Sequence, residues 1–170
     1  MSKGMLFCET PSGVSPASAS AHGEHPVVEV RLEDGFNDWT VLVDDEAPRT
    51  LATSSAPVQV LARGLSAGAH DLLLVRRTEP YFGEAVFRGF VLADGERLMP
   101  PPPPEARRVE FIGDSITAGF ADEGGPQSRA TEDGFSAFGP VAARALHAGW
   151  HVEAVSGIGV YRNLGDTLPP

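Results

Sequence analysis

Residues 100 to 104 are five consecutive prolines, and no other feature constrains the fold of this chain as strongly. Proline has a fixed φ and no backbone N–H, so such a run enters neither the interior of a helix nor an inner strand. It favours a stiff polyproline spacer. A ligand for a proline-recognition domain is the alternative interpretation, but the flanking residues do not favour it. We therefore predict a linker over residues 100–106 that separates two structural units.

The residues before the linker have the pattern of an antiparallel β-sandwich. From Val27 onwards, valine and leucine alternate with charged residues, which is the period of a half-buried strand. Further strand-like runs follow, separated by residues that favour turns. These runs span residues 39–43, 58–61, 71–76 and 85–92. We predict a sandwich over residues 27–99, preceded by a poorly ordered tail over residues 1–26, in which serine, glycine and proline recur without an apolar period.

Four aromatic residues of the predicted sandwich have two possible roles. Their ring faces could stack on sugars, but their alternation with polar neighbours favours the sandwich core. These residues are Trp39, Phe82, Phe87 and Phe90.

The residues after the linker have the alternating strand and helix pattern of an α/β unit. We predict a short buried strand over Val109–Ile112, a loop over residues 122–134, a helix over residues 135–146 with Pro140 in its first turn, and a second strand over residues 150–155. Strand, helix and strand form one βαβ unit. Because a sheet of two parallel strands leaves apolar faces uncovered, we expect residues 107–170 to be part of a larger domain that is truncated here.

The composition excludes several classes of function. The chain has 13 Lys and Arg against 23 Asp and Glu, a net charge of −10, which disfavours binding to a nucleic-acid backbone. Cys8 is the single cysteine, so neither an internal disulfide nor a cysteine-based zinc cluster is possible. Histidines and carboxylates do not cluster at ligand spacing. We predict no metal site and no cofactor.

Targeting signals are weak in this sequence. Its apolar runs are too short for a membrane-spanning helix, and its first residues lack the apolar stretch of a secretory signal. By default this predicts a cytoplasmic protein with no membrane partner. The sequence has no signature of an oligomeric state.

The sharpest chemical feature is a serine directly after the first strand of the α/β unit. Gly113-Asp114-Ser115 stands where a strand turns into a helix, which is where α/β sheets place reactive groups. Gly113 permits the tight turn, and backbone N–H groups at a helix start can hold an anionic oxygen. Ser115 is thus either a nucleophile for an ester carbonyl or an ordinary helix cap.

Two blocks of sequence resemble a known enzyme family. Residues 113–119, Gly-Asp-Ser-Ile-Thr-Ala-Gly, resemble the first signature block of the SGNH (GDSL-type) hydrolases. Residues 155–163, Val-Ser-Gly-Ile-Gly-Val-Tyr-Arg-Asn, resemble the second block in the form seen in carbohydrate esterase family 2. Residues 76–83, residues 87–90 and the prolines before residues 107–111 look like that family's N-terminal module and its junction with the esterase domain.

This resemblance covers about residues 27–165 and implies both a fold and an activity. The fold is an N-terminal jelly-roll β-sandwich, followed by the first βαβ part of a flavodoxin-like, three-layer SGNH hydrolase domain. The activity is removal of O-acetyl groups from polysaccharides of the xylan or mannan kind, through an acetyl-enzyme. The implied partner is an acetylated polysaccharide or oligosaccharide. Family members are often secreted, which differs from the default expectation of a cytoplasmic protein.

The resemblance also implies roles for single residues. Ser115 would be the nucleophile, and its own N–H would stabilise the oxyanion together with that of Gly159, for which Gly157 is the rival. Asp114 would brace the nucleophile turn through backbone hydrogen bonds. Three further residues would lie near the cleft, with Arg162 expected to be a structural ion-pair partner: Tyr161, Arg162 and Asn163.

The family's general base is not among the residues that match. Its third block, Gly-x-Asn-Asp, and its last block, which holds a histidine, would both follow residue 170. The five histidines present are each predicted to be structural or solvated: His22, His25, His70, His147 and His151. Because a serine needs a base, we expect the chain to be inactive or nearly so by itself. The alternatives are a non-catalytic carbohydrate-binding or remnant protein, and an SGNH esterase for other small acyl esters.

Overall fold

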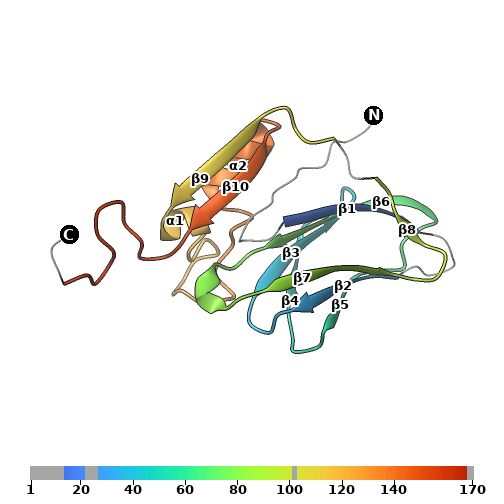
Figure 1. The fold of residues 1–170 in the computed structure, drawn as a ribbon, viewed down its shortest axis with the longest axis horizontal. Coiled ribbons are helices and arrows are strands. Elements are labelled where there is room, and N and C mark those ends of the chain that lie inside the picture. Colours follow the sequence, from blue (N-terminus) through green and yellow to red (C-terminus); the bar gives the residue numbers. More distant parts are fainter. Residues whose placement is uncertain (1–13, 22–26, 101–102, 168–170) are drawn as a thin grey trace.

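Two antiparallel sheets form the first part of the molecule, which is a computed structural model that describes residues 14–21, 27–100 and 103–167 (Figure 1). The larger sheet has, in spatial order, β4 (Arg49–Ala52), β3 (Asp38–Val43), β6 (Gly68–Arg76), β1 (Val14–Ala21) and β8 (Arg97–Leu98). The smaller sheet has β5 (Val58–Arg63), β2 (Val27–Glu33) and β7 (Val86–Leu92). The predicted mostly-β N-terminal part is confirmed.

The two sheets enclose one apolar core. Along β2 every second residue is buried, because alternate side chains of a strand point to opposite faces. Its inward residues pack against residues of β5 in the same sheet and of β3 and β6 in the facing sheet. The buried residues of this core are Val28, Val30, Leu32, Trp39, Val41, Val43, Leu61, Leu72 and Leu74. Burying one such side chain contributes about 1.5–3 kcal/mol. Phe87 and Phe90 also pack against this cluster, so Trp39, Phe87 and Phe90 serve the core.

One prediction for the N-terminal part was wrong. Residues 14–21, expected within a poorly ordered tail, form β1, which pairs with β6 along its whole length from Val14–Val75 to Ala21–Gly68. Backbone hydrogen bonding to β6 supplies the order that the weakly apolar sequence does not signal. The short strands β4 and β8 were also not predicted. The other residues of the expected tail, 1–13 and 22–26, lie outside the described residues.

Strand and helix elements alternate in the second part of the molecule. β9 (Arg108–Gly113) leads into the short helix α1 (Ser115–Ala118), and a loop with neither helix nor strand leads to α2 (Phe138–Ala145) and β10 (Gly149–Ala154). The two strands pair in parallel, with Gly113 opposite Ala154. Pro140 lies in the first turn of α2, as expected. Residues 103–106 of the predicted linker have neither helix nor strand, and Pro101 and Pro102 lie outside the described residues.

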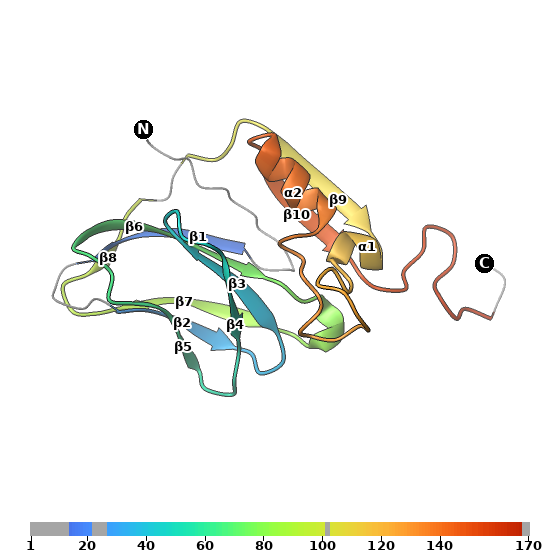
Figure 2. The ribbon, with the colours of Figure 1, turned by 180° about the vertical axis from the view of Figure 1, so that it is seen from behind.

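The two parts share a second core on the outer face of the larger sheet. Val75 of β6 packs with Phe135, Ala143 and Trp150 of the α/β unit, and Leu42 and Leu73 lie at its margin. This contact explains why β3 is buried on both faces. Seen from behind, α2 and the β9–β10 pair lie together beside this sheet as a further layer (Figure 2).

The prediction that the first α/β strand is buried was wrong. Along β9, exposed residues alternate with half-buried ones, and Ile112 is 77% exposed. Phe111 points to α2, where its ring meets that of Phe138 at a centroid distance of 5.9 Å. Only one face of the β9–β10 pair is therefore covered within the described residues.

Candidate active site

The turn that carries Ser115 is built by its neighbours. β9 ends at Gly113, Asp114 is the N-cap of α1, and Ser115 is the first residue of that helix. The Asp114 carboxylate accepts a hydrogen bond of 3.1 Å from the backbone N–H of Ile116. The alternative in which Ser115 itself caps the helix is therefore wrong, because Asp114 has that role.

Two glycines allow the turn to close tightly. A Cβ on Gly113 would collide with the Thr117 side chain, whose own Cβ would lie 2.8 Å away. Gly119 ends α1 with a φ of 86°, in the left-handed region, where its missing side chain lets the backbone of Asp133 approach. The short helix is thus fixed against the loop that precedes α2.

The hydroxyl of Ser115 is available for chemistry. Ser115 is half-buried, and its neighbour Ile116 is 73% exposed. No residue of the described part of the chain is hydrogen-bonded to the Ser115 hydroxyl. Its backbone carbonyl accepts from Phe120 at 2.9 Å, so the main chain of the turn is held while the side chain is left free.

The second sequence block begins beside the first. Because β9 and β10 are parallel, their carboxyl ends meet at one edge of the pair, and Val155 donates from its N–H to the Gly113 carbonyl at 3.3 Å. The next residues form turns. Gly157 has a φ of 82°, and its carbonyl accepts from Leu164 at 2.7 Å. The structure therefore brings Gly113, Asp114 and Ser115 next to the start of the second block.

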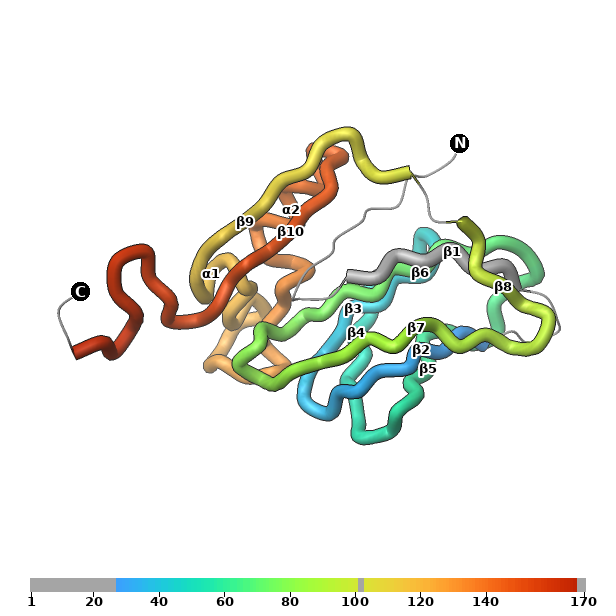
Figure 3. The backbone as a smooth tube through the Cα atoms, in the orientation of Figure 1, coloured from blue at the N-terminus to red at the C-terminus, as the bar shows by residue number. Residues whose placement is uncertain are grey.

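The later residues of the second block are bonded among themselves. The N–H of Gly159 donates to Asn163 Oδ1 at 3.2 Å, and a Cβ on Gly159 would collide with the Arg162 carbonyl. Arg162 donates to the backbone oxygen of Asp166 at 2.7 Å, so the expected ion pair is not the contact it makes. Tyr161 is 75% exposed. This segment runs away from both sheets (Figure 3), and no hydrogen bond joins Gly159 to Ser115 among the described residues.

Sequence reasoning missed a buried carboxylate that reaches the second block from the sandwich. Glu79 follows β6, is 4% exposed, and accepts a hydrogen bond of 2.6 Å from the N–H of Ser156 through its Oε2. Its Oε1 accepts from Gln127 Nε2 at 3.1 Å. In the sequence, residues 76–83 stand out only through the family resemblance. The usable signal was a run of charged and polar residues directly after an apolar strand.

A second buried carboxyl lies beside Glu79. Glu132 is fully buried, and its Oε1 accepts a hydrogen bond from the N–H of Glu79. Burial raises the pKa of Glu132 to about 7, and the hydrogen bond from the Glu79 N–H lowers this pKa by more than the negative charge of Glu79 raises it. Two adjacent carboxyls thus hold the junction between the sandwich and the α/β unit.

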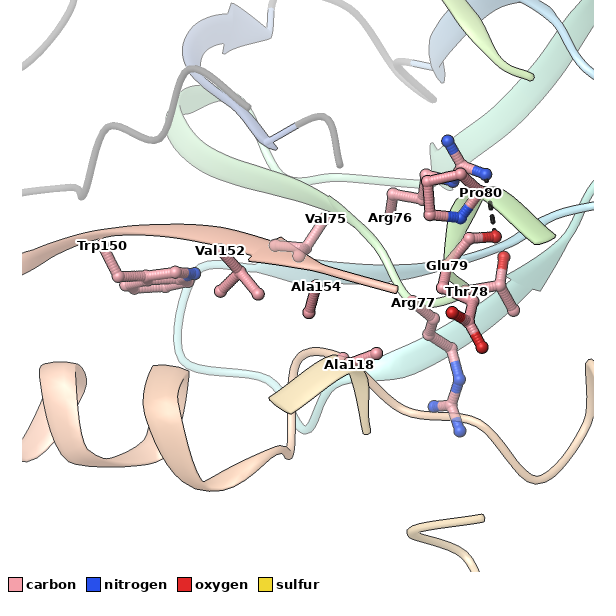
Figure 4. A pocket seen from close by; sticks show the side chains of 11 residues that line it. Val75, Arg76, Arg77, Thr78, Glu79, Pro80, Ala118, Trp150, Val152 and Ala154 are labelled. Carbon is pink, nitrogen blue, oxygen red and sulfur yellow. Dashed lines mark hydrogen bonds between the residues drawn. The ribbon is translucent and has the colours of Figure 1, made fainter. Parts of the chain in front are cut away.

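Two buried arginines complete this junction. Arg76 donates to Asn37 Oδ1 at 2.7 Å and to the Glu79 carbonyl at 3.1 Å, a bond drawn in Figure 4. Arg77 pairs with Asp133 at 3.0 Å and with Glu123 at 2.8 Å. Arg76 is the last residue of β6 and Arg77 follows it, so the end of one strand supplies the cations and the carboxylate of the interface.

A small cavity lies where the two parts meet. It has a volume of about 40 Å³. Figure 4 shows the β10 side chains Trp150, Val152 and Ala154 along one side and Val75 above them, with Arg77 and Glu79 at the far end. Its size suits a water molecule rather than a sugar.

The described histidines do not serve Ser115. His70, expected in a turn, lies in β6, where it contacts Asp44 at 2.7 Å and the Ser66 carbonyl at 2.9 Å. The hydrogen bond to Asp44 raises the pKa of His70. His151 contacts Glu153 at 2.8 Å near the start of β10, and His147 follows the end of α2. His22 and His25 lie outside the described residues.

No group of three or more potential metal ligands occurs among residues 14–21, 27–100 and 103–167. In this part of the chain, no helix is both long enough and apolar enough to cross a membrane.

Comparison with known proteins assigns the family. A family model described as "Carbohydrate esterase 2 N-terminal" matches residues 12–102, more than half of the chain. The chain is 35% identical over 147 residues to "Cellulase/esterase CelE" of Acetivibrio thermocellus, and 30% identical over 146 residues to an "Acetylxylan esterase / glucomannan deacetylase" of Cellvibrio japonicus. These alignments cover 83% and 82% of this chain, but only 18% and 40% of the relatives.

A solved structure agrees with this assignment. A family two carbohydrate esterase from Clostridium thermocellum, determined in complex with cellohexaose, superposes with a TM-score of 0.77 at 30% identity. The match covers 94% of this chain and 49% of that one. The chain therefore belongs to carbohydrate esterase family 2, and the N-terminal domain of that family extends over its residues 12–102.

Proposed function

We propose that Ser115 is the nucleophile of a carbohydrate O-acetylesterase that acts on acetylated polysaccharides of the xylan or mannan kind. The observation that carries this proposal is the position of Ser115. It is the first residue of a capped helix at the carboxyl end of β9, beside the end of β10, and its hydroxyl is free of hydrogen bonds to described residues. The relatives named as acetylxylan esterases support the substrate class.

The proposed reaction proceeds in two steps. The Ser115 oxygen attacks the acetyl carbonyl while a base takes its proton, and the sugar alcohol leaves with a proton as the acetyl-enzyme forms. Water then attacks the acetyl-enzyme and releases acetate, which restores the hydroxyl. The N–H of Ser115 has no acceptor within α1, as is usual for a first helical residue, so it is suited to stabilise the oxyanion.

Gly159 is the proposed second donor to the oxyanion, with Gly157 as the rival. Both lie in the segment that starts beside the Ser115 turn. A donor of this kind is typically worth about 2.7–4 kcal/mol in the transition state. Because the Gly159 N–H is bonded to Asn163, that residue must release it before it can bind an acyl oxygen.

We further propose that the sandwich is a jelly roll and that residues from 107 onwards belong to a flavodoxin-like SGNH domain. The parallel β9–β10 pair with α2 between them supports this assignment. The linker of residues 100–106, which begins with the five prolines, is the proposed boundary. Because His70 and His151 are engaged by Asp44 and Glu153, we expect the 170 residues alone to hydrolyse esters slowly or not at all.

A chimera tests the proposed function. Residues 1–165 would replace the aligned part of the Acetivibrio thermocellus relative, whose remaining length supplies the rest of the enzyme. We expect acetate release from acetylated xylan, loss of this activity in Ser115→Ala, and no change in Ser55→Ala, which alters an exposed serine of the sandwich. A folded chimera that binds acetylated xylo-oligosaccharides but releases no acetate would contradict the esterase and favour a non-catalytic binding protein.

Substrate preference is measured on the same chimera. We expect the chimera to hydrolyse acetylated xylan or glucomannan faster than esters with longer acyl chains. A preference for longer acyl chains would assign the site to other small esters instead.

A further inference from the structure

We propose that Glu79 is a positioning residue for the candidate active site. It lies in the sandwich, yet its carboxylate holds the first residue of the second sequence block and so fixes the direction of the segment that carries Gly157 and Gly159. The catalytic consequence rests on the proposed function, whereas the contact itself does not.

Both oxygens of the Glu79 carboxylate are occupied. Oε2 accepts from the N–H of Ser156 at 2.6 Å, across 77 positions of sequence, and Oε1 accepts from Gln127 at 3.1 Å. Glu79 is 4% exposed. A buried carboxylate is costly unless it is hydrogen-bonded, so the charge itself favours keeping Ser156 and Gln127 in place.

The backbone of Glu79 is held as firmly as its side chain. Its N–H donates to Glu132 Oε1, and its carbonyl accepts from Arg76 at 3.1 Å. Glu132 and Arg76 are both buried. The carboxylate therefore projects from a fixed point of the sandwich rather than from a mobile loop.

The contact between Glu79 and Ser156 occurs where hydrogen bonding to β9 ends. Val155 still donates to Gly113 of β9, but the next N–H, that of Ser156, turns away from β9 and binds Glu79. Gly157 follows with a positive φ, which gives the backbone a sharp change of direction. Glu79 thus sets the point at which the second block leaves the sheet.

A charge-assisted hydrogen bond of this length distinguishes Glu79 from an ordinary packing residue. Such bonds are roughly twice as strong as neutral ones, and they are sensitive to replacement of the carboxylate by an amide. In Glu79→Gln, one of the two oxygens becomes an NH₂ group, which faces a donor on either side. That variant removes one hydrogen bond with almost no change in shape.

NMR on the 170-residue chain tests the contact without any need for activity. In the parent we expect a scalar coupling through the hydrogen bond, from the Ser156 nitrogen to the Glu79 carboxylate carbon. In Glu79→Ala the Ser156 amide should exchange with solvent about 10- to 100-fold faster, and in Glu79→Gln by an intermediate factor. Gln127→Ala removes the other partner of the same carboxylate, and Ser156→Ala keeps the donating N–H. Both controls should leave the Ser156 exchange rate at the parent value.

Two results would overturn the proposal. One is a Ser156 exchange rate that is equal in Glu79→Ala and Gln127→Ala. The other, which needs no variant to fold, is the absence of the coupling in the parent chain.

The catalytic consequence has its own readout. In the esterase chimera, Glu79→Ala should lower kcat for acetyl release with little change in KM, whereas Gln127→Ala should leave both unchanged. If the Ser156 amide exchanges slowly in the parent chain but the chimera releases no acetate, the contact is supported and the proposed esterase function is rejected. If the chimera is active and Glu79→Ala leaves its kcat unchanged, the positioning role of Glu79 is rejected.

Discussion

The guanidinium of Arg77 lies 3.0 Å from the carboxylate of Asp133, and side-chain exposures of 8% and 5% make this the most deeply buried ion pair among the described residues. Arg77 belongs to the end of the sandwich and Asp133 to the loop before α2. The Gly134 N–H also donates to the Arg77 carbonyl at 2.8 Å. Side chain and main chain of one residue therefore bind the α/β unit to the sandwich.

Arg77→Met should destabilise the chain strongly. The substitution leaves the Asp133 carboxylate buried without its cation, and breaking a buried pair in this way costs about 3–5 kcal/mol. Urea denaturation followed by tryptophan fluorescence measures the change. Arg88→Met is the control, because Arg88 pairs with Glu33 in an exposed position and should have little effect. Equal losses in both variants would contradict a special role for the buried pair.

Glu132 should make stability depend on pH near neutrality. Its pKa is raised to about 7 in the folded chain, from an ordinary value of 4.5, so the folded chain binds more protons between these values. The free energy of unfolding therefore falls as the pH rises through this range, by at most about 3 kcal/mol. In Glu132→Gln this dependence should be lost, and the variant should gain stability relative to the parent between about pH 5 and pH 8.

The control for Glu132 is a carboxyl with the opposite shift. The hydrogen bond from Arg88 lowers the pKa of Glu33, so Glu33 is ionised in the folded and unfolded chains throughout this range. The difference between Glu33→Gln and the parent should stay constant. A constant difference for Glu132→Gln as well would contradict a neutral Glu132 in the folded chain.

Gly113→Ala should disturb the turn before Ser115. A methyl group at this position would collide with Thr117, and overpacking of this kind typically costs about 1–3 kcal/mol. Gly35→Ala is the matched control, since nothing lies within 4 Å of a Cβ there. The free energies of unfolding of the two variants are the measurement. A neutral Gly113→Ala would show that Thr117 moves aside without cost.

Asp114→Ala and Ser115→Ala should have different effects on the fold. Loss of the Asp114 cap removes the partner of the Ile116 N–H and should cost about 1 kcal/mol. Ser115→Ala removes no hydrogen bond to a described residue and should leave the free energy of unfolding unchanged. Amide exchange at Ile116 reports the cap directly. Faster exchange in Ser115→Ala would assign the capping role to the serine after all.

The strands of the sandwich could be predicted because each carries its own signal. Val28, Val30 and Leu32 alternate with charged residues, and the structure buries the apolar members of this run. β1 could not be predicted in this way, since its order comes from pairing with β6 across more than 40 residues of sequence. Short, exposed β4 has a different cause: it pairs with the neighbouring strand β3, but it has no apolar alternation of its own.

The sequence predicts those parts of the candidate site that depend on local pattern, but not those that depend on contacts between residues far apart in the chain. The position of Ser115 after the first strand follows from the local pattern of strand, glycine and helix. The contact between Glu79 and Ser156 joins residues that no local pattern relates. The strand β9 was predicted to be buried, but its exposed face agrees with the expectation that a sheet of two parallel strands leaves apolar faces uncovered.

Under the oxyanion role proposed for Gly159, the hydrogen bond from its amide to Asn163 gives an incoming acyl oxygen an intramolecular competitor. Ligand affinity at this amide is then the difference between two hydrogen bonds rather than the strength of one. Asn163 consequently lowers the affinity of this amide for an oxyanion. Shortening the Asn163 side chain would tighten the binding of oxyanion mimics, even though it removes a polar group from the loop.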